Sequence, residues 1–179
     1  MAGPKVDTAA WVRAALERFE QPLVRYAQRF TGDLETARDV VQDTFLKLCT
    51  ADRTKVENHL AAWLYTVCRN RALDVRKKEQ RMTPFAEGQA ERLTDAAPAP
   101  VETAGLREEH ALVWQALEGL SGRQREAFRL KFQDDLSYRE ISQIMGVSLG
   151  TVANLVAAGL EAVRNELRDK LDLAQEGSR

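Results

Sequence analysis

The chain has 179 residues, of which 44% are hydrophobic and 30% charged, and its formal net charge at pH 7 is -1. This length allows one domain or two small ones, and the composition is typical of a globular protein. The near-zero net charge excludes a protein that coats nucleic acid with a uniformly basic surface, although local basic patches remain possible.

Membrane and metal sites are not expected. No apolar run reaches the ~18 residues of a membrane-spanning helix, and no signal peptide opens the chain. We therefore expect a cytoplasmic protein with no membrane insertion. Cys49 and Cys68 lie in apolar helical patterns, without a Cys-x-x-Cys pair or paired histidines nearby. This pattern indicates reduced thiols, no metal site and no cofactor.

The amino-terminal part has apolar residues at helical spacing and no strand signals. Residues 8–31 follow a period near 3.6, and Pro22 predicts that this span is two helices, because proline suits the first turn of a helix. A helix is expected over 34–50, then a polar loop over 51–57. A long helix should run from Leu60 to about Gln80.

Residues 82–105 differ in composition from both flanks. Five helix-breaking residues lie in this stretch: Pro84, Gly88, Pro98, Pro100 and Gly105. Residues 82–109 hold six acids and two bases, so the segment is acidic. We predict a flexible acidic linker between two small helical domains, 1–81 and 106–179, in an all-α fold.

The carboxy-terminal part contains a helix-turn-helix pattern. A first helix carries Leu112, Val113, Leu117 and Leu120, and Ser121 to Gln124 caps the next. In the stretch 136–152, Ser137 and Glu140 form a capping box, and Gly146 permits the left-handed turn that ends a helix. Ser148 or Thr151 can cap the last helix, expected from Thr151 to about Leu173.

Three clusters suggest binding, and each also has a plainer interpretation. The helix-turn-helix predicts binding of duplex DNA, although a helical hairpin packed in a core can have the same sequence pattern. Residues 69–81 hold six bases against Asp74 and Glu79, which favours phosphate contacts or merely a solvated helix end. Three residues share one helix face at spacing i, i+3 and i+4, either as an exposed stripe or as a docking face for a basic helix: Asp39, Gln42 and Asp43.

The order of these motifs resembles the extracytoplasmic-function sigma factors of bacterial RNA polymerase. The motifs are Asp-Val-Val-Gln-Asp-Thr-Phe at 39–45, Ala-Trp-Leu-Tyr at 62–65, the basic helix end, the linker and the helix-turn-helix. The resemblance covers about residues 15–170, and its specificity comes from the order, since each motif alone is weak. It implies a promoter-specificity subunit that is not an enzyme.

The resemblance also implies sites. Region two would bind the clamp helices of the largest polymerase subunit through Asp39, Gln42 and Asp43. It would melt and hold the promoter -10 element, with Asn70 at a flipped-out base and the bases Arg69, Arg71, Arg76, Lys77 and Lys78 on the strand backbone. Region four would read the -35 element and contact the flap of the second-largest subunit. An anti-sigma factor is an expected further partner.

The last helix departs from the family pattern. From Ser148 to Leu160 there is no charged residue, and the family's basic positions correspond to Ala153, Leu155, Ala157 and Ala158. Three interpretations stay open: an A/T-rich element is read, a protein is bound instead of DNA, or the alanines are substitutions in a variant. In the first, the contacts come from Ser148, Thr151 and Asn154, with Arg139 and Arg164 on the backbone.

Other function classes fit less well. A regulator that binds DNA without polymerase needs no acidic stripe followed by Trp63-Leu-Tyr and Asn70. An interaction-only helical adaptor gains some weight from the uncharged helix. A hydrolase or transferase finds no support, because the sequence has no Gly-rich phosphate loop, no paired His/Cys site and no nucleophile elbow.

Overall fold

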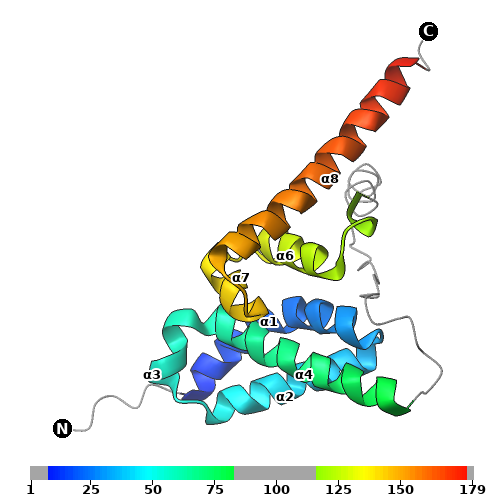
Figure 1. Cartoon of the computed structure of the whole chain (residues 1–179). Coiled ribbons are helices and arrows are strands. Elements are labelled where there is room, and N and C mark those ends of the chain that lie inside the picture. The colour runs from blue at the N-terminus through cyan, green and yellow to red at the C-terminus, as the bar shows by residue number, and fades with distance from the viewer. Residues whose placement is uncertain (1–7, 83–115, 177–179) are drawn as a thin grey trace. The chain divides into compact units, whose positions relative to one another are not determined.

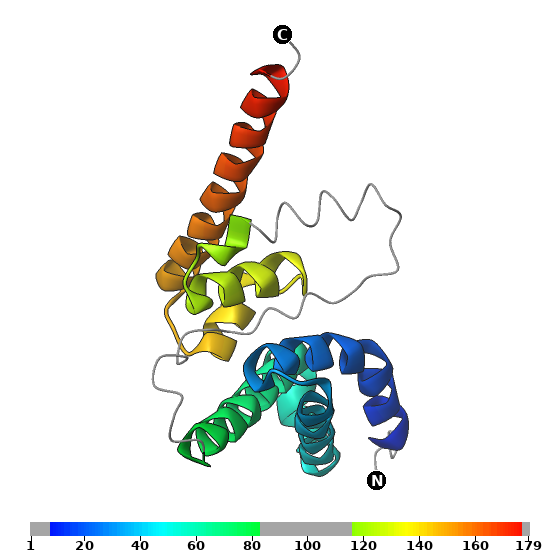
Figure 2. The same cartoon turned by 90° about the vertical axis from the view of Figure 1, so that its right-hand side faces the viewer.

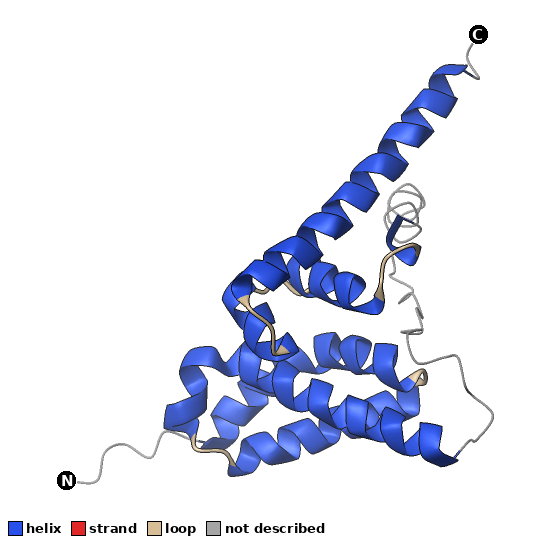
Figure 3. Cartoon of the chain, viewed as in Figure 1, coloured by secondary structure: helices blue, strands red, loops and turns tan. Residues whose placement is uncertain are grey.

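A computed structural model describes residues 8–82 and 116–176 of the chain, which divide between two units, Met1–Pro98 and Ala99–Arg179. The described residues form helices and short connections, without a strand among them, and Figure 3 shows this directly. The all-α prediction with two helical bodies is therefore confirmed. The predicted linker lies outside the described residues, apart from Met82.

The first unit is built on three long helices, α1 (Thr8–Thr31), α2 (Leu34–Thr50) and α4 (Leu60–Met82), which pack on one another (Figure 1). Asp33 caps α2, because its carboxylate accepts a hydrogen bond of 2.8 Å from the Thr36 amide. The core centres on Tyr26, whose ring lies 5.1 Å from that of Tyr65 between centroids. Leu23, Leu48 and both tyrosines are almost fully buried.

The prediction of two helices over residues 8–31 was wrong. α1 is one helix with Pro22 inside it, and Figure 2 shows that its axis bends. A proline in a helix interior costs about 3 kcal/mol through its missing N–H and its ring. Phe19, Leu23 and Val24 are buried on either side of Pro22, and their packing offsets that cost.

The predicted polar loop over 51–57 was also wrong in part. Residues Arg53–Val56 form the short helix α3, and Glu57–His59 continue as the 3-10 turn η1. Asp52 starts α3 by accepting hydrogen bonds from both the amide and the hydroxyl of Thr54. Val56 is buried, so one apolar side chain anchors an otherwise polar segment.

The second unit packs α6 (Gly122–Phe132) and α7 (Tyr138–Met145) on α8 (Leu149–Glu176). The expected capping box of Ser137 with Glu140 is present, and the expected cap at Ser121 is also a capping box, with Gln124. The last helix begins at Leu149 and ends at Glu176, so it is longer than predicted at both ends. Of the helix expected just before Ser121, residues 116–118 are helical and Leu117 is buried, while Leu112 and Val113 lie outside the described residues.

Within the described ranges, no single helix is long and apolar enough to cross a membrane. Only α7 and α8 taken together reach such a length and hydropathy, and the chain bends by 104° between them.

Gly159 lets α8 approach α6 closely. A Cβ at this position would lie 2.4 Å from Cδ2 of Phe128, far inside van der Waals contact. We therefore predict that Gly159→Ala destabilises the second unit by about 1–3 kcal/mol, because Phe128 must shift. Amide hydrogen exchange in α6 of the full chain measures this loss for that unit alone.

Gly150→Ala is the matched control. The nearest atom to a Cβ there is the Ser148 hydroxyl oxygen at 3.9 Å, an ordinary contact, so protection in α6 should stay unchanged or rise. Equal protection in the two variants would show that close packing at Gly159 contributes nothing to stability.

Candidate nucleic-acid interface

The outer face of α2 carries the predicted polar stripe of Asp39, Gln42 and Asp43. Asp39 and Gln42 are exposed and Asp43 is half-exposed. The opposite face is buried against α1 and α4 through Ala37, Val40, Val41, Thr44, Phe45 and Leu48. The burial of that face fixes the direction of the polar side chains, so the α2 polar stripe points to solvent.

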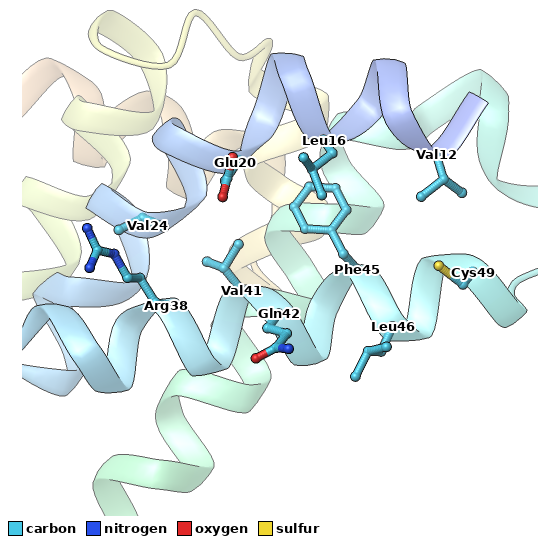
Figure 4. A pocket seen from close by; sticks show the side chains of 10 residues that line it. All are labelled: Val12, Leu16, Glu20, Val24, Arg38, Val41, Gln42, Phe45, Leu46 and Cys49. Atoms are coloured by element: carbon cyan, nitrogen blue, oxygen red, sulfur yellow. The ribbon is translucent and has the colours of Figure 1, made fainter. Parts of the chain in front are cut away.

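An apolar groove lies beside this stripe, between α1 and α2, and was not predicted from the sequence. It has a volume of about 450 Å³, and Figure 4 shows Leu16 of α1 opposite Phe45 of α2, and Val12 of α1 opposite Cys49 of α2. Leu16 is 38% exposed and Leu46 59% exposed, so both are open to a partner. Gln42 lines the groove as well, which makes the groove and the α2 polar stripe one continuous surface.

The two cysteines differ in environment. Cys49 is exposed and lines the α1/α2 groove, whereas Cys68 is fully buried in the core. Burial raises the pKa of the Cys68 thiol to about 12, against a weaker opposing hydrogen bond with Thr44. Neither forms a disulfide. In the part of the chain that the structure describes, no three His, Cys, Asp or Glu side chains gather as metal ligands would.

The predicted DNA-contacting residues of region two wrap around α4 instead of sharing one face. Successive helical residues point about 100° apart, so Arg69, Asn70 and Arg71 face three directions. Arg76, Lys77 and Lys78 repeat these directions seven residues later. Asn70 and Lys77 are exposed opposite the buried side of the helix, while Arg69 and Arg76 are half-buried. We call these six residues the α4 basic edge.

Arg71 joins the two surfaces. Its Nε donates a hydrogen bond of 2.8 Å to Oδ2 of Asp43, which belongs to the α2 polar stripe. Sequence reasoning assigned the two residues to different partners, polymerase and DNA. No sequence signal connects positions 28 residues apart, because the pairing depends on how α2 and α4 pack.

The helix-turn-helix has the geometry that its sequence predicts. The chain turns by 104° between α7 and α8, inside the range of about 90–120° for this motif. Gly146 adopts the left-handed conformation, with φ of 65°. Ser148, not Thr151, caps α8: its hydroxyl oxygen accepts a hydrogen bond of 3.1 Å from the Thr151 amide, and the two hydroxyl oxygens lie 2.9 Å apart.

The first turns of α8, residues 149–160, present a neutral face, and we call this segment the reading helix. Thr151 and Asn154 are exposed at spacing i and i+3, so they are neighbours. Leu149 is 51% exposed and Leu160 43%. Arg139 is exposed on α7, and Arg164 is exposed ten residues beyond Asn154, about 15 Å further along α8.

Comparisons with known proteins agree on one family. The family model "Sigma-70 region 2" matches residues 15–82, and "Sigma-70, region 4" matches residues 110–163. The ferric citrate uptake sigma factor FecI of Escherichia coli is 31% identical over 125 residues, which are 70% of this chain and 72% of FecI. The ECF RNA polymerase sigma factor SigL of Mycobacterium tuberculosis is 29% identical, over 94% of this chain and 96% of its own.

A solved structure is similar as well. The sigma factor RpoE of Bartonella quintana, crystallised with the anti-sigma factor NepR, has a TM-score of 0.62 and 25% identity over 87% of this chain and 96% of its own. Region 2 and region 4 thus fall one on each helical unit. The chain belongs to the extracytoplasmic-function sigma factors of the sigma-70 family, and it is an RNA polymerase sigma factor for promoter-specific initiation.

Proposed function

We propose that the first unit anchors core RNA polymerase and captures the melted -10 strand, while the second unit recognises the -35 element as duplex. The observation that supports this most is the placement of α2. Its apolar face is buried against α1 and α4, so Asp39 and Gln42 lie open beside an apolar groove. The chain itself catalyses no reaction, and it works in the cytoplasm with the polymerase.

The core partner is a helix with basic and apolar side chains, supplied by the clamp helices of the largest subunit. An apolar side chain can enter the α1/α2 groove between Leu16 and Leu46. Basic side chains can pair with Asp39 and Asp43, and Gln42 can hydrogen-bond at the groove's edge. Apolar anchoring with a charged rim is the common composition of protein interfaces.

The α4 basic edge is suited to a single strand. Asn70 is exposed and carries an amide, which can donate to and accept from the edge of an unstacked base. Lys77 is exposed on the same face of α4 as Asn70, two helical turns further on, so phosphates can follow the helix away from that base. Phosphate neutralisation of this kind supplies affinity without sequence preference.

For the second unit, the exposure of the reading helix favours recognition of an A/T-rich element. Asn154 can bond both N6 and N7 of adenine, and Leu149 and Ala157 are exposed for contact with thymine methyl groups. Arg139 and Arg164 are exposed for backbone phosphates. The same unit is the one we assign to the flap of the second-largest subunit.

We also propose that an anti-sigma factor controls the chain. The similar sigma factor of Bartonella quintana was crystallised with one. The α1/α2 groove offers an inhibitor a site with two half-open leucines, Leu16 and Leu46. An inhibitor there would block the surface that we assign to polymerase.

The core contact is tested by reversing one charge. Asp39→Lys should lower the affinity for core polymerase at least tenfold and reduce run-off transcription in parallel, because a basic helix then meets a like charge. The free energy of unfolding should change by less than about 0.5 kcal/mol, since Asp39 is exposed. Asp39 tests the core contact more specifically than Asp43 does, because charge reversal at Asp43 also breaks the ion pair with Arg71.

Glu17→Lys, a charge reversal of the same sign at an exposed residue of α1 that does not line the α1/α2 groove, is the matched control and should keep the affinity for core polymerase. Equal loss in both variants, or no association of the unmodified chain with core at micromolar concentration, would refute the proposed core contact.

The role of Asn70 predicts a separation of two activities. Asn70→Ala should lower the fraction of open promoter complexes about tenfold, the cost of one good base contact, while the affinity for core stays the same. Permanganate reactivity of unpaired thymines measures opening, and a binding titration measures core affinity. The exposed amide Gln80→Ala serves as the control on the same helix. A parallel loss of core binding and opening would assign Asn70 a structural role instead.

A further inference from the structure

The pair of Asp43 and Arg71 connects two surfaces that the proposed function assigns to different macromolecules. Asp43 lies on α2 in the α2 polar stripe, and Arg71 lies on α4 in the α4 basic edge. Their side chains meet at 2.8 Å, and they are 40% and 45% exposed respectively. Each side chain is therefore held by the other and still within reach of a partner.

The surroundings of the pair allow a second ligand to enter. The pair borders an open hollow of about 470 Å³ between α2 and α4, lined also by Lys47, Thr50 and Asp74. Arg71 uses Nε for its bond to Asp43, so its terminal nitrogens can turn to another acceptor. Asp43 uses Oδ2, so its other oxygen can accept from another donor.

The charges of the pair cancel for any partner at a distance. A phosphate that approaches Arg71 also meets the carboxylate of Asp43, and a basic side chain that approaches Asp43 also meets the guanidinium of Arg71. Because attraction to phosphate depends on net positive charge, this cancellation weakens both contacts in the free chain. A partner that takes one member restores the full charge of the other.

We propose that Asp43 and Arg71 mask each other in the free chain, and that docking of core polymerase on Asp43 releases Arg71 for the backbone of the separated promoter strand. This inference rests on the proposed function of the two surfaces. It makes the ion pair a coupling element, and coupling between two binding sites is reciprocal. Bound single-stranded DNA should therefore also raise the affinity for core.

The test is a double-mutant cycle with Asp43→Asn, Arg71→Gln and the double variant, in the full chain. The DNA probe is a fluorescein-labelled, mixed-sequence single strand of about 20 nucleotides, long enough to cover one binding site. Asp43→Asn should tighten binding of this probe by the free chain about two- to fivefold, the effect expected of a half-exposed ion pair. The same change should have no effect when Arg71 is already glutamine.

The affinity of the same variants for core polymerase is the second measurement of the cycle. Arg71→Gln should tighten core binding by the same two- to fivefold, and this gain should disappear when Asp43 is already asparagine. Both gains should shrink at high salt, which screens exposed charges. Asp39→Asn is the control for net charge, because it removes one acid from the same helix without breaking the pair, and its gain in probe affinity should be clearly smaller.

Two kinds of failure can be told apart. If the unmodified chain binds neither core nor the probe, the proposed function itself fails. If the chain binds both but the effects of Asp43→Asn and Arg71→Gln simply add, the masking is wrong and the proposed function stands. Weaker probe binding by Asp43→Asn would also overturn the masking, because Asp43 would then orient Arg71 for DNA.

Discussion

The burial of one face of α2 between α1 and α4 is the constraint on which the first unit depends. Val40, Thr44 and Leu48 are almost fully buried, so α2 cannot rotate without exposing its apolar face. The opposite face must therefore carry Asp39, Gln42 and Asp43 to solvent. The same packing brings α4 alongside, and it sets the distance between Asp43 and Arg71. One packed interface thus positions both surfaces that we assign to partners.

In our proposal, the two units recognise their partners by different physical means. The first combines an apolar groove with charges on α2 and α4, which suits a protein helix and a flexible strand. The second presents a rigid helix whose start is fixed by Ser148 and Gly146. Because its first turns are uncharged, we propose that recognition of the -35 element there depends on the shape and hydrogen bonds of base edges more than on phosphate attraction.

Local patterns predicted most of the helices, and tertiary packing accounts for the failures. The capping boxes at Ser121 and Ser137 are short-range hydrogen bonds, so the sequence sufficed. Pro22 led to the wrong prediction of two helices, because the packing of side chains on both sides of it outweighs the free-energy cost of a proline inside a helix. The three residues of the α2 polar stripe follow from helical spacing alone. The α1/α2 groove and the pair of Asp43 with Arg71 do not, since both require the relative position of helices distant in sequence.

The most direct test of the central claim is to ask what each surface touches in one assembled complex. Photo-cross-linking residues at Glu20, on the rim of the α1/α2 groove, and at Lys77, on the α4 basic edge, place probes without replacing Gln42 or Asn70. In open promoter complexes, the probe at position 20 should attach to the largest polymerase subunit and the probe at 77 to an unpaired DNA strand. Attachment of both probes to the same partner, or to neither, would contradict the account.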